Sequence, residues 1–396
     1  MLQGKHIVLG VTGSIAAYKI ANLASMLVKA KADVTVIMTQ NATNFINPIT
    51  FETLTGNKCL VDTFDRNFQY SVEHVSLAKQ SDVFLVAPAS ANIIGKAANG
   101  IADDMLTTTL LAAKCPKIIS PAMNTNMYEN PIVQDNLKKL EHYGMEVITP
   151  ANGYLACGDT GAGKMPEPET LYQYILKAVY PKDLAGKKVL VTAGPTQEKL
   201  DPVRYISNHS TGKMGYALAE VCAMRGAEVT LISGRTALAA PLFVKTIPVI
   251  SAKDMFEAVR ECYASQDIVI KAAAVADYRP KYTSEEKIKK KDGALSIEME
   301  RTDDILAYLG EHRGNRPFIC GFSMETEHML ENSREKLKKK KIDMIAANNL
   351  KQEGAGFGTD TNIVTLLTSD SEKELPKLSK QETASCIVDE ILRQMK

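Results

Sequence analysis

Residues 6–15 read HIVLGVTGSI, a short apolar run followed at once by a turn that contains glycine and serine. The run predicts a buried strand from His6 to Gly10, and the residues from Ile15 onward predict a helix. A strand, a glycine-containing turn and a helix start present free backbone N–H groups to a phosphate. The glycines do not fit the GxGxxG pattern of dinucleotide-binding domains. The same turn can also be an ordinary strand–helix connection, so the phosphate interpretation depends on other residues near it.

The rest of the first half repeats this alternation of strand and helix. Further strands are predicted at 34–38, 82–87, 117–120 and 146–149. Alternating strands and helices predict a doubly wound parallel sheet, whose ligands bind beyond the carboxyl ends of the strands. Polar or small residues follow three of the strands, at 39–41, 88–92 and 121–124. We therefore expect these clusters to meet at one edge of the sheet.

The composition indicates a soluble globular protein in a reducing compartment. The 396 residues suffice for two or three domains, and the net charge of +1 gives no general attraction to nucleic acid or anionic membranes. Gly10, Gly13 and Lys19 interrupt the apolar N-terminal stretch, which therefore resembles neither a signal peptide nor a membrane span. The seven cysteines are scattered without a CxxC pair, which favours reduced thiols. We expect a cytoplasmic protein that binds neither nucleic acid nor membrane.

The stretch 155–165, LACGDTGAGKM, allows two interpretations. Cys157 precedes three glycines, which suits the hinges of a mobile lid because glycine adopts backbone angles closed to other residues. Gly158, four residues, Gly163 and Lys164 also nearly spell a nucleotide-binding P-loop. That motif next requires Ser or Thr to hold a metal ion, and Met165 stands there. A P-loop would also need a strand immediately before Gly158, and the sequence predicts none.

Three polar side chains in the first half are candidates for chemistry, and each has an ordinary structural interpretation. His74 precedes a predicted helix and could be a surface or capping residue. Asn124 could cap the helix that follows the turn at 121–124. Cys157 could be a small buried side chain, although its glycine-rich surroundings argue against burial.

The first half resembles the flavin-containing cysteine decarboxylases, and among them the phosphopantothenoylcysteine decarboxylases. The resemblance rests on segments 13–17, 88–92, 100–106, 121–124 and 156–158. It implies a flavodoxin-like domain that binds FMN at interfaces within a trimer, and such trimers can assemble further. The implied FMN contacts are Gly13, Ser14, Ile15, Thr39, Asn41, Ser90, Ala91, Asn92 and Ala122. His74 is implied to be the base, Asn124 to hold the substrate carboxylate, and Cys157 to be the proton donor on a mobile flap. Tyr128 departs from the family, where Trp is usual.

These residue types suit the reaction that the resemblance implies. Direct loss of CO₂ from a cysteine carboxylate would leave an unstabilised carbanion. If flavin first oxidises the thiol side to a thioaldehyde, the electrons delocalise into C=S, and reduced flavin later returns a hydride while an acid supplies a proton. A neutral thiol, with an ordinary pKa of about 8.5, can be that acid at pH 7. A histidine exchanges protons in the same pH range.

The polar segment 181–188 predicts a linker between two domains, 1–180 and 189–396. A new strand begins at Val189, much as the chain itself begins, so we expect two doubly wound, Rossmann-like α/β domains without a convincing sequence repeat. The loop 206–215 carries hydroxyls, glycines and a lysine before a helix, which favours an anion. The lysine runs at 287–291 and 336–341 are mostly interpreted as solvated faces, and polyphosphate needs only one or two of these lysines.

The second half resembles the phosphopantothenate–cysteine ligases. The resemblance rests on segments 193–196, 201–204, 207–215, 272–277, 287–289 and 321–322. In that family CTP converts the phosphopantothenate carboxylate into an acyl cytidylate, with release of pyrophosphate, and the cysteine amine then attacks. Lysines and a divalent metal suit the charge that spreads over the phosphates. One departure is Ser210-Thr211-Gly212, where Ser-Ser-Gly is expected, and Thr211 keeps a hydroxyl.

The ligase resemblance also implies site residues. Nucleotide and substrate contacts are implied for Arg204, Ala273, Asp277, Lys287, Thr302, Asp303, Asp304, Ile305, Phe322, Lys336 and Lys340. Of these, Arg204 would support substrate binding, and Asn208 would act in turnover of the acyl cytidylate. Mg²⁺ is expected with CTP, and its protein ligands stay unassigned. Roles for Asn348, Asn349 and Phe357 also stay unassigned.

Joined in this order, the two halves resemble the bifunctional enzymes of bacterial coenzyme A biosynthesis. The resemblance implies that 4'-phosphopantothenate, L-cysteine and CTP react in the second domain, and that the first domain then yields 4'-phosphopantetheine. It implies a homo-oligomer built from trimers of the first domain, with dimer contacts through the second. A flavin-binding regulatory homologue without decarboxylase activity is the alternative. The presence of both His74 and Cys157 argues against that alternative.

Overall fold

The computed structural model describes residues 2–64, 73–154, 158, 160–290, 295–314, 316–325, 328–349 and 358–396. The chain divides into two compact units, Met1–Tyr180 and Pro181–Lys396. Segment 181–188, for which we predicted a linker, falls in the second unit. There the Leu184 side chain is fully buried, and its N–H donates to the Arg225 carbonyl (3.1 Å). Within the described ranges, no helix is both long and apolar enough to cross a lipid bilayer.

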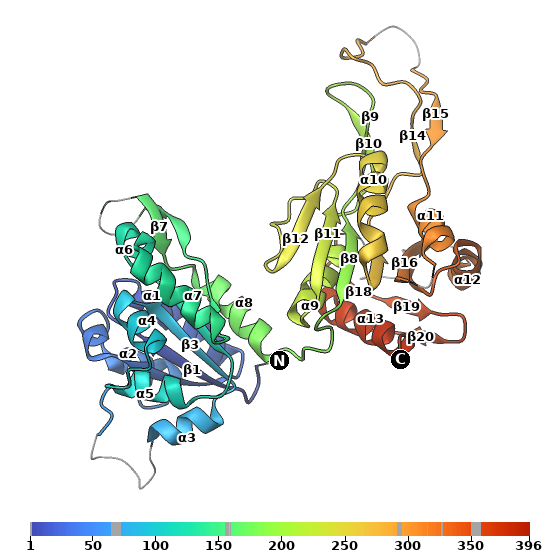
Figure 1. Ribbon diagram of the computed structural model, residues 1–396. Coiled ribbons are helices and arrows are strands. Elements are labelled where there is room, and N and C mark those ends of the chain that lie inside the picture. Colours follow the sequence, from blue (N-terminus) through green and yellow to red (C-terminus); the bar gives the residue numbers. More distant parts are fainter. Residues whose placement is uncertain are drawn as a thin grey trace. The chain divides into compact units, whose positions relative to one another are not determined.

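The first unit is built on a five-stranded parallel sheet with the order β2-β1-β3-β4-β5 (Figure 1). Its strands are β1 (His6–Val11), β2 (Asp33–Met38), β3 (Val83–Ala89), β4 (Lys117–Pro121) and β5 (Glu146–Val147). This is the flavodoxin-like order, in which β1 and β3 flank the switch point where such sheets bind ligands. The predicted fold class is confirmed. Strand β3 continues beyond its predicted end at Ala87, and β5 is shorter than predicted.

Helices cover both faces of this sheet (Figure 1). One face carries α1 (Ala17–Lys29) and α8 (Pro168–Val179), and the other carries α4 (Ala91–Ala98), α5 (Met105–Ala112) and α7 (Pro131–His142). Successive strand residues point to opposite faces, so Ile7 and Leu9 of β1 enter one core while Val8 enters the other. Burial on both faces explains why the strands are apolar throughout. The connections contain η1 (Gln40–Asn44), α2 (Pro48–Thr55), α3 (Glu73–Gln80) and α6 (Thr125–Glu129), and a hairpin of β6 (Ala151–Tyr154) and β7 (Thr160–Lys164).

The second unit is built on an eight-stranded sheet with the order β12-β11-β8-β13-β16-β17-β19-β20. Its strands are β8 (Lys188–Ala193), β11 (Glu228–Ser233), β12 (Val244–Pro248), β13 (Ile268–Lys271), β16 (Phe318–Glu325), β17 (Met344–Asn349), β19 (Val364–Leu367) and β20 (Glu372–Glu374). The first six in this order are parallel, β19 runs antiparallel to β17, and β20 runs antiparallel to β19. The parallel part has the Rossmann order, so β8 and β13 flank its switch point.

The second sheet is also covered on both faces (Figure 1). One face carries α9 (Lys213–Met224) and α13 (Lys380–Gln394), and the other carries α10 (Ala252–Cys262), α11 (Ile305–His312) and α12 (Met329–Lys340). The smaller elements are η2 (Tyr263–Ser265) and three antiparallel pairs: β9 (Gln197–Lys199) with β10 (Tyr205–Ser207), β14 (Tyr278–Pro280) with β15 (Met299–Arg301), and β18 (Thr361–Asn362) with β21 (Leu378–Ser379).

One buried hydroxyl joins the two connections at the switch point of the first unit. The Thr12 side chain, directly after β1, is only 1% exposed. Its Oγ1 donates to the Pro88 carbonyl (2.7 Å) and accepts from the Ser90 N–H (3.0 Å). Thr12 thereby fixes the turn after β1 against the end of β3. Two backbone groups depend on this hydroxyl, and buried backbone groups are costly to leave unpaired.

Replacing Thr12 with valine keeps the shape of the side chain and removes the hydroxyl. Each buried polar group left without a partner costs about 1–3 kcal/mol, so Thr12→Val should lower the unfolding temperature of the first unit, measured by calorimetry. Thr53→Val is the matched control, because the Thr53 hydroxyl bonds within α2 at an exposed position and such changes stay within about 0.5 kcal/mol. Equal shifts in the two variants would contradict a special role for Thr12.

Candidate active sites

A cavity of about 430 Å³ lies at the carboxyl edge of the first sheet. Three segments form it: the turn after β1 with the start of α1, the turn after β4, and the β6–β7 hairpin. Its lining residues are Ser14, Ile15, Ala16, Tyr18, Lys19, Ala122, Met123, Asn124, Tyr154, Gly163, Lys164 and Met165. Four of the residues predicted for cofactor or substrate therefore line one cavity, namely Ser14, Ile15, Ala122 and Asn124.

The other predicted flavin contacts lie at the ends of neighbouring strands, outside this lining. A Cβ on Gly13 would lie 3.0 Å from the Asn41 Cβ, so the turns after β1 and β2 are in close contact. The Thr39 N–H donates to the Val11 carbonyl (3.0 Å), which holds the same two turns together. The polar ends of β1 and β2 thus meet, as expected from the alternation of strands and helices.

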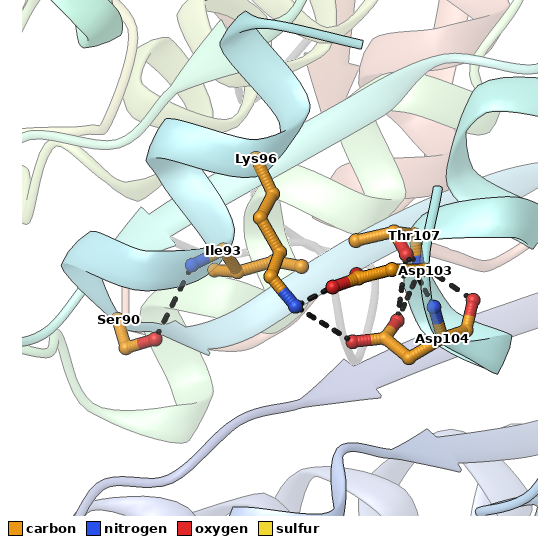
Figure 2. Close-up of polar contacts among 6 residues, drawn as sticks. All are labelled: Ser90, Ile93, Lys96, Asp103, Asp104 and Thr107. Carbon is orange, nitrogen blue, oxygen red and sulfur yellow. Dashed lines mark hydrogen bonds and ion pairs between the residues drawn. The ribbon is translucent and has the colours of Figure 1, made fainter. Parts of the chain in front are cut away.

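The β3 end contributes the start of helix α4. The Ser90 Oγ accepts from the Ile93 N–H (3.5 Å), as Figure 2 shows, so Ser90 is the N-cap of α4. Ala91 and Asn92 form the first turn of that helix. Its remaining free N–H groups carry partial positive charge at the switch edge, which suits an anion.

The connection between α4 and α5 is held by charged side chains (Figure 2). The Lys96 ammonium donates to Asp103 (2.7 Å) and lies 3.5 Å from the Asp104 carboxylate, and Asp104 caps α5 by accepting from the Thr107 N–H (2.8 Å). The hydrogen bond to Asp103 raises the pKa of Lys96, and the same bond lowers the pKa of Asp103. Segment 100–106, on which the family resemblance partly rests, therefore has a structural role, because it joins α4 to the start of α5.

The segment around Cys157 contains a β-hairpin that the sequence did not predict. Leu155, Ala156, Cys157 and Asp159 lie outside the described residues. The strand β7 spans Thr160–Lys164, and the next helix starts only at Pro168. A P-loop requires a helix to begin at its Gly-Lys pair, so the strand excludes the P-loop interpretation.

Two glycines of β7 lie tightly against the turn after β4. The Met123 N–H donates to the Gly163 carbonyl (3.1 Å), and a Cβ on Gly163 would lie 2.3 Å from the Met123 carbonyl oxygen. A Cβ on Gly161 would lie 2.6 Å from the Thr125 Oγ1. Gly163 thus allows close packing of two backbones, and Gly161 allows a backbone to lie against the Thr125 side chain; a role of these glycines as hinges stays a prediction.

His74 and Asn124, two predicted catalytic residues, occupy different parts of the first unit. His74 lies in the first turn of α3 and is partly buried. Helix α3 packs against α5, and His74 does not line the cavity. Asn124 lines the cavity, and its Oδ1 accepts from the Asn126 N–H (2.9 Å). The capping interpretation of Asn124 is confirmed, and it is compatible with a second role in the cavity.

Two adjoining cavities lie at the carboxyl edge of the second sheet, with volumes of about 360 and 490 Å³. We call the first the α9 cavity, because Asn208 and the residues 210–215 before and within α9 line it. We call the second the α11 cavity, because residues 301–306 before and within α11 line it. Both are lined by Lys271, Val275, Asp277, Phe322 and Lys336.

The predicted ligase residues lie in these two cavities with two exceptions. Those that line one or both are Asn208, Ala273, Asp277, Thr302, Asp303, Asp304, Ile305, Phe322, Lys336 and Lys340. Arg204 and Lys287 do not. The Arg204 guanidinium donates to the buried Asp201 carboxylate (3.0 and 2.5 Å) and to the Ile288 carbonyl (2.7 Å). Arg204 thus holds the irregular segment beside Lys287, whose side chain is exposed.

Buried threonines tie the segments on the two sides of the second switch point. The Thr192 Oγ1 accepts from the Ala273 N–H (3.2 Å), and the Thr196 Oγ1 accepts from the Ala276 N–H (3.0 Å). Both threonines are fully buried. The Asn208 Nδ2 donates to the Ala274 carbonyl (2.9 Å). These contacts fix the shape of residues 272–277, which line the α9 cavity.

The start of α9 is brought to the cavity by glycine. Gly212 has a φ of +80° and precedes α9, and a Cβ on Gly215 would lie 2.5 Å from the Ala193 Cβ. Larger residues would push the helix away from β8. Since Gly212, Lys213 and Gly215 line the α9 cavity, the free N–H groups of a twelve-residue helix lie at its wall, which suits an anionic ligand.

Charged groups gather where the two cavities meet. Lys340 is paired with Asp304, which also accepts from the Ala307 N–H (2.9 Å). Burial acts to raise the pKa of Asp304, but the bonds from Lys340 and Ala307 hold it below its ordinary value. Burial, and then the charge of Lys336, lower the pKa of Lys271 to about 8. No cluster of three His, Cys, Asp or Glu side chains able to hold a metal ion occurs in the described part of the chain.

Sequence reasoning missed several cavity residues. In the first unit these include Tyr18, Lys19 and Tyr154, and in the second they include Lys271, whereas Asn348, named without a role, does line the α9 cavity. A signal for Lys271 was present, since it is the polar last residue of an apolar strand at the switch point. Tyr154 had no such signal, because the hairpin that carries it was not predicted.

The packing of β7 on the turn after β4 makes a prediction for the first unit. Gly163→Ala should detach the hairpin, because a side chain would overlap the Met123 carbonyl and the φ of Gly163 is +128°. Hydrogen–deuterium exchange at the Met123 N–H should become faster. Gly153→Ala is the matched control in the same hairpin, since its Cβ would approach only the Lys164 side chain, at 3.6 Å. Slow exchange retained in Gly163→Ala would show that the contact is not needed.

Two family models match the chain. The model described as "Flavoprotein" matches residues 1–180, and the one described as "DNA/pantothenate metabolism flavoprotein C-terminal domain" matches residues 184–395. A crystal structure of the C-terminal domain of a coenzyme A biosynthesis bifunctional protein, CoaBC, is 47% identical. It covers 54% of this chain and 97% of that chain, with a TM-score of 0.47.

Curated relatives match from end to end. The coenzyme A biosynthesis bifunctional protein CoaBC of Bacillus subtilis (strain 168) is 48% identical, over 99% of this chain and 97% of the relative. The protein of the same name from Vibrio vulnificus (strain CMCP6) is 44% identical, over 100% and 98%. The resemblance of the two joined halves is thus confirmed. The chain belongs to the family of coenzyme A biosynthesis bifunctional proteins.

Proposed function

We propose that the second half joins L-cysteine to 4'-phosphopantothenate at the expense of CTP, and that the first half decarboxylates the product to 4'-phosphopantetheine. The observation that carries this proposal is the position of the predicted residues. In each half they gather at the carboxyl edge of a parallel sheet, beside its switch point, around cavities of a few hundred Å³. Family membership supports both halves. A cytoplasmic location is part of the same proposal.

The residues at the edge of the first sheet fit FMN. The turn after β1 and the start of α4 offer backbone N–H groups for a phosphate, and Ile15, Ala122 and Met123 give the cavity an apolar wall for a flat ring. When bound, FMN supplies the oxidation of the substrate's thiol side that permits loss of CO₂. The protein's own part is to position the substrate and to supply protons.

We assign Asn124 to the substrate carboxylate and Cys157 to proton donation. Asn124 lines the cavity, and its amide N–H groups can donate to a carboxylate while its Oδ1 caps α6. Cys157 follows Tyr154, which lines the cavity, by three residues.

We further propose that a second copy of the chain completes the first site. The apolar side chains of Ile15, Tyr18 and Tyr154 at the cavity are 57%, 57% and 72% exposed, and such exposed groups favour coverage by a partner. His74, the proposed base, lies away from the cavity of its own chain. A homo-oligomer, with trimers of the first domain and dimer contacts through the second, would satisfy both observations.

In the second unit we place CTP in the α11 cavity and 4'-phosphopantothenate in the α9 cavity. A carboxylate oxygen attacks the α-phosphorus, and the bond to pyrophosphate breaks, so pyrophosphate leaves with the electron pair. The cysteine nitrogen then attacks the acyl carbon and loses a proton, and CMP leaves. Because the described residues contain no metal cage, Mg²⁺ would be held largely by the phosphates and water.

For the first half, we expect purified protein to be yellow, with a flavin absorbance band.

Cys157→Ser should still release CO₂ but stall before protonation, because a serine hydroxyl is a much weaker acid than a thiol. Mass spectrometry should then detect the oxidised ene-thiol product. Cys386→Ser is the control, since Cys386 lies in α13 of the other unit, and it should turn over normally. Normal turnover by Cys157→Ser would remove Cys157 from the mechanism, and flavin without any CO₂ release would favour the regulatory alternative.

For the second half, we expect pyrophosphate release that depends on 4'-phosphopantothenate and is faster with CTP than with ATP. With L-cysteine present, mass detection should find 4'-phosphopantothenoylcysteine and then 4'-phosphopantetheine. Pyrophosphate release is measured by a coupled phosphate assay. Equal rates with the two nucleotides would contradict the assignment of CTP.

A further inference from the structure

Lys271 is a cation at the junction of the two cavities of the second unit. It is the last residue of β13, a strand that flanks the switch point of the sheet. Lys271 lines both the α9 cavity and the α11 cavity. The charged groups that act on the pKa of Lys271 are Lys336, Asp304, Asp277 and Lys340.

The other lysines at the junction already have partners, whereas Lys271 has none among the described residues. Lys340 is paired with Asp304, and the Lys336 ammonium donates to the Phe322 carbonyl (3.3 Å). Asp304 is further engaged by the Ala307 N–H. Removing a cation from water without a partner is unfavourable. A cation that lacks a direct hydrogen bond or ion pair among the described residues is therefore suited to an anionic ligand.

The reaction chemistry specifies which ligand atom belongs at this junction. The α-phosphorus is the atom at which the nucleotide and the acid substrate meet, so it must lie where their cavities join. Negative charge grows on the oxygens around it as the carboxylate attacks and pyrophosphate departs. A preorganised cation that meets this growing charge lowers the barrier of the step.

We propose that Lys271 contacts the α-phosphoryl group of the nucleotide and stabilises the charge that develops there during acyl cytidylate formation. This assignment rests on the proposed function of the second half and deepens it. No electron transfer or additional reactant is involved, because Lys271 stays protonated and only donates hydrogen bonds. It is a catalytic residue in the strict sense, since it touches a reacting group.

The test uses Lys271→Met in the full chain. Pyrophosphate release at saturating CTP and 4'-phosphopantothenate should fall about 100-fold or more, as for loss of one preorganised donor. The KM for CTP should change much less, because the contact strengthens in the transition state. Lys271→Arg should recover part of the rate by restoring the charge. Lys271→Met should unfold at the same temperature as the unsubstituted chain or at a higher one, since it removes a charge that has no direct partner among the described residues.

Lys188→Met is the matched control, because Lys188 begins β8 at the opposite end of the same parallel sheet, and its rate should be unchanged. Decarboxylation of supplied 4'-phosphopantothenoylcysteine should be normal in both variants. A loss confined to KM, or a lowered unfolding temperature that accounts for the lost rate, would overturn the assignment. Equal rates for Lys271→Met and the unsubstituted chain would overturn the assignment of Lys271 and leave the proposed function standing. If the unsubstituted chain released no pyrophosphate, both would be overturned.

Discussion

The sites of both units depend on a threonine hydroxyl that bridges a switch point. At such a point the two central strands send their connections in opposite directions, so no backbone hydrogen bonding need hold the two connections together. Thr12 closes this gap in the first unit by bonding to both Pro88 and Ser90. In the second unit Thr192 and Thr196 accept from the Ala273 and Ala276 N–H groups, and they add to backbone hydrogen bonds from Ala274 to Gly194 and from Thr196 to Ala274. A short side chain with both a donor and an acceptor can join two backbones without filling the space left for a ligand.

Close contact between backbones is the second constraint. Gly163 lets the hairpin lie on the turn after β4, and Gly215 lets α9 start against β8. At both positions glycine is needed because there is no space for a Cβ, more than because the backbone must be flexible. The walls of both sites are therefore made largely of main chain, which is positioned more precisely than long side chains.

The sequence was sufficient to predict the five strands of the first sheet, because full burial on both faces leaves a continuous apolar run such as Val83–Ala87. Residues directly after those runs, such as Ser14 and Asp277, were correctly expected at the cavities. The β6–β7 hairpin could not be predicted, since Thr160–Lys164 has little intrinsic strand propensity and is stabilised by tertiary contact with Met123 and Thr125. Arg204 was placed in the site by resemblance, whereas it contacts Asp201, which is local in the chain, and Ile288, which is 84 residues away and could not be foreseen from the sequence.

The buried position of Leu184 has a consequence for modularity. Because segment 181–188 is already part of the second unit, the boundary between the two units is the peptide bond after Tyr180. Each unit has its own sheet, with a hydrophobic core on each face, and its own cavities at the carboxyl edge of that sheet. The two halves can thus be fused, separated or inherited as independent genes without either one losing part of its hydrophobic core.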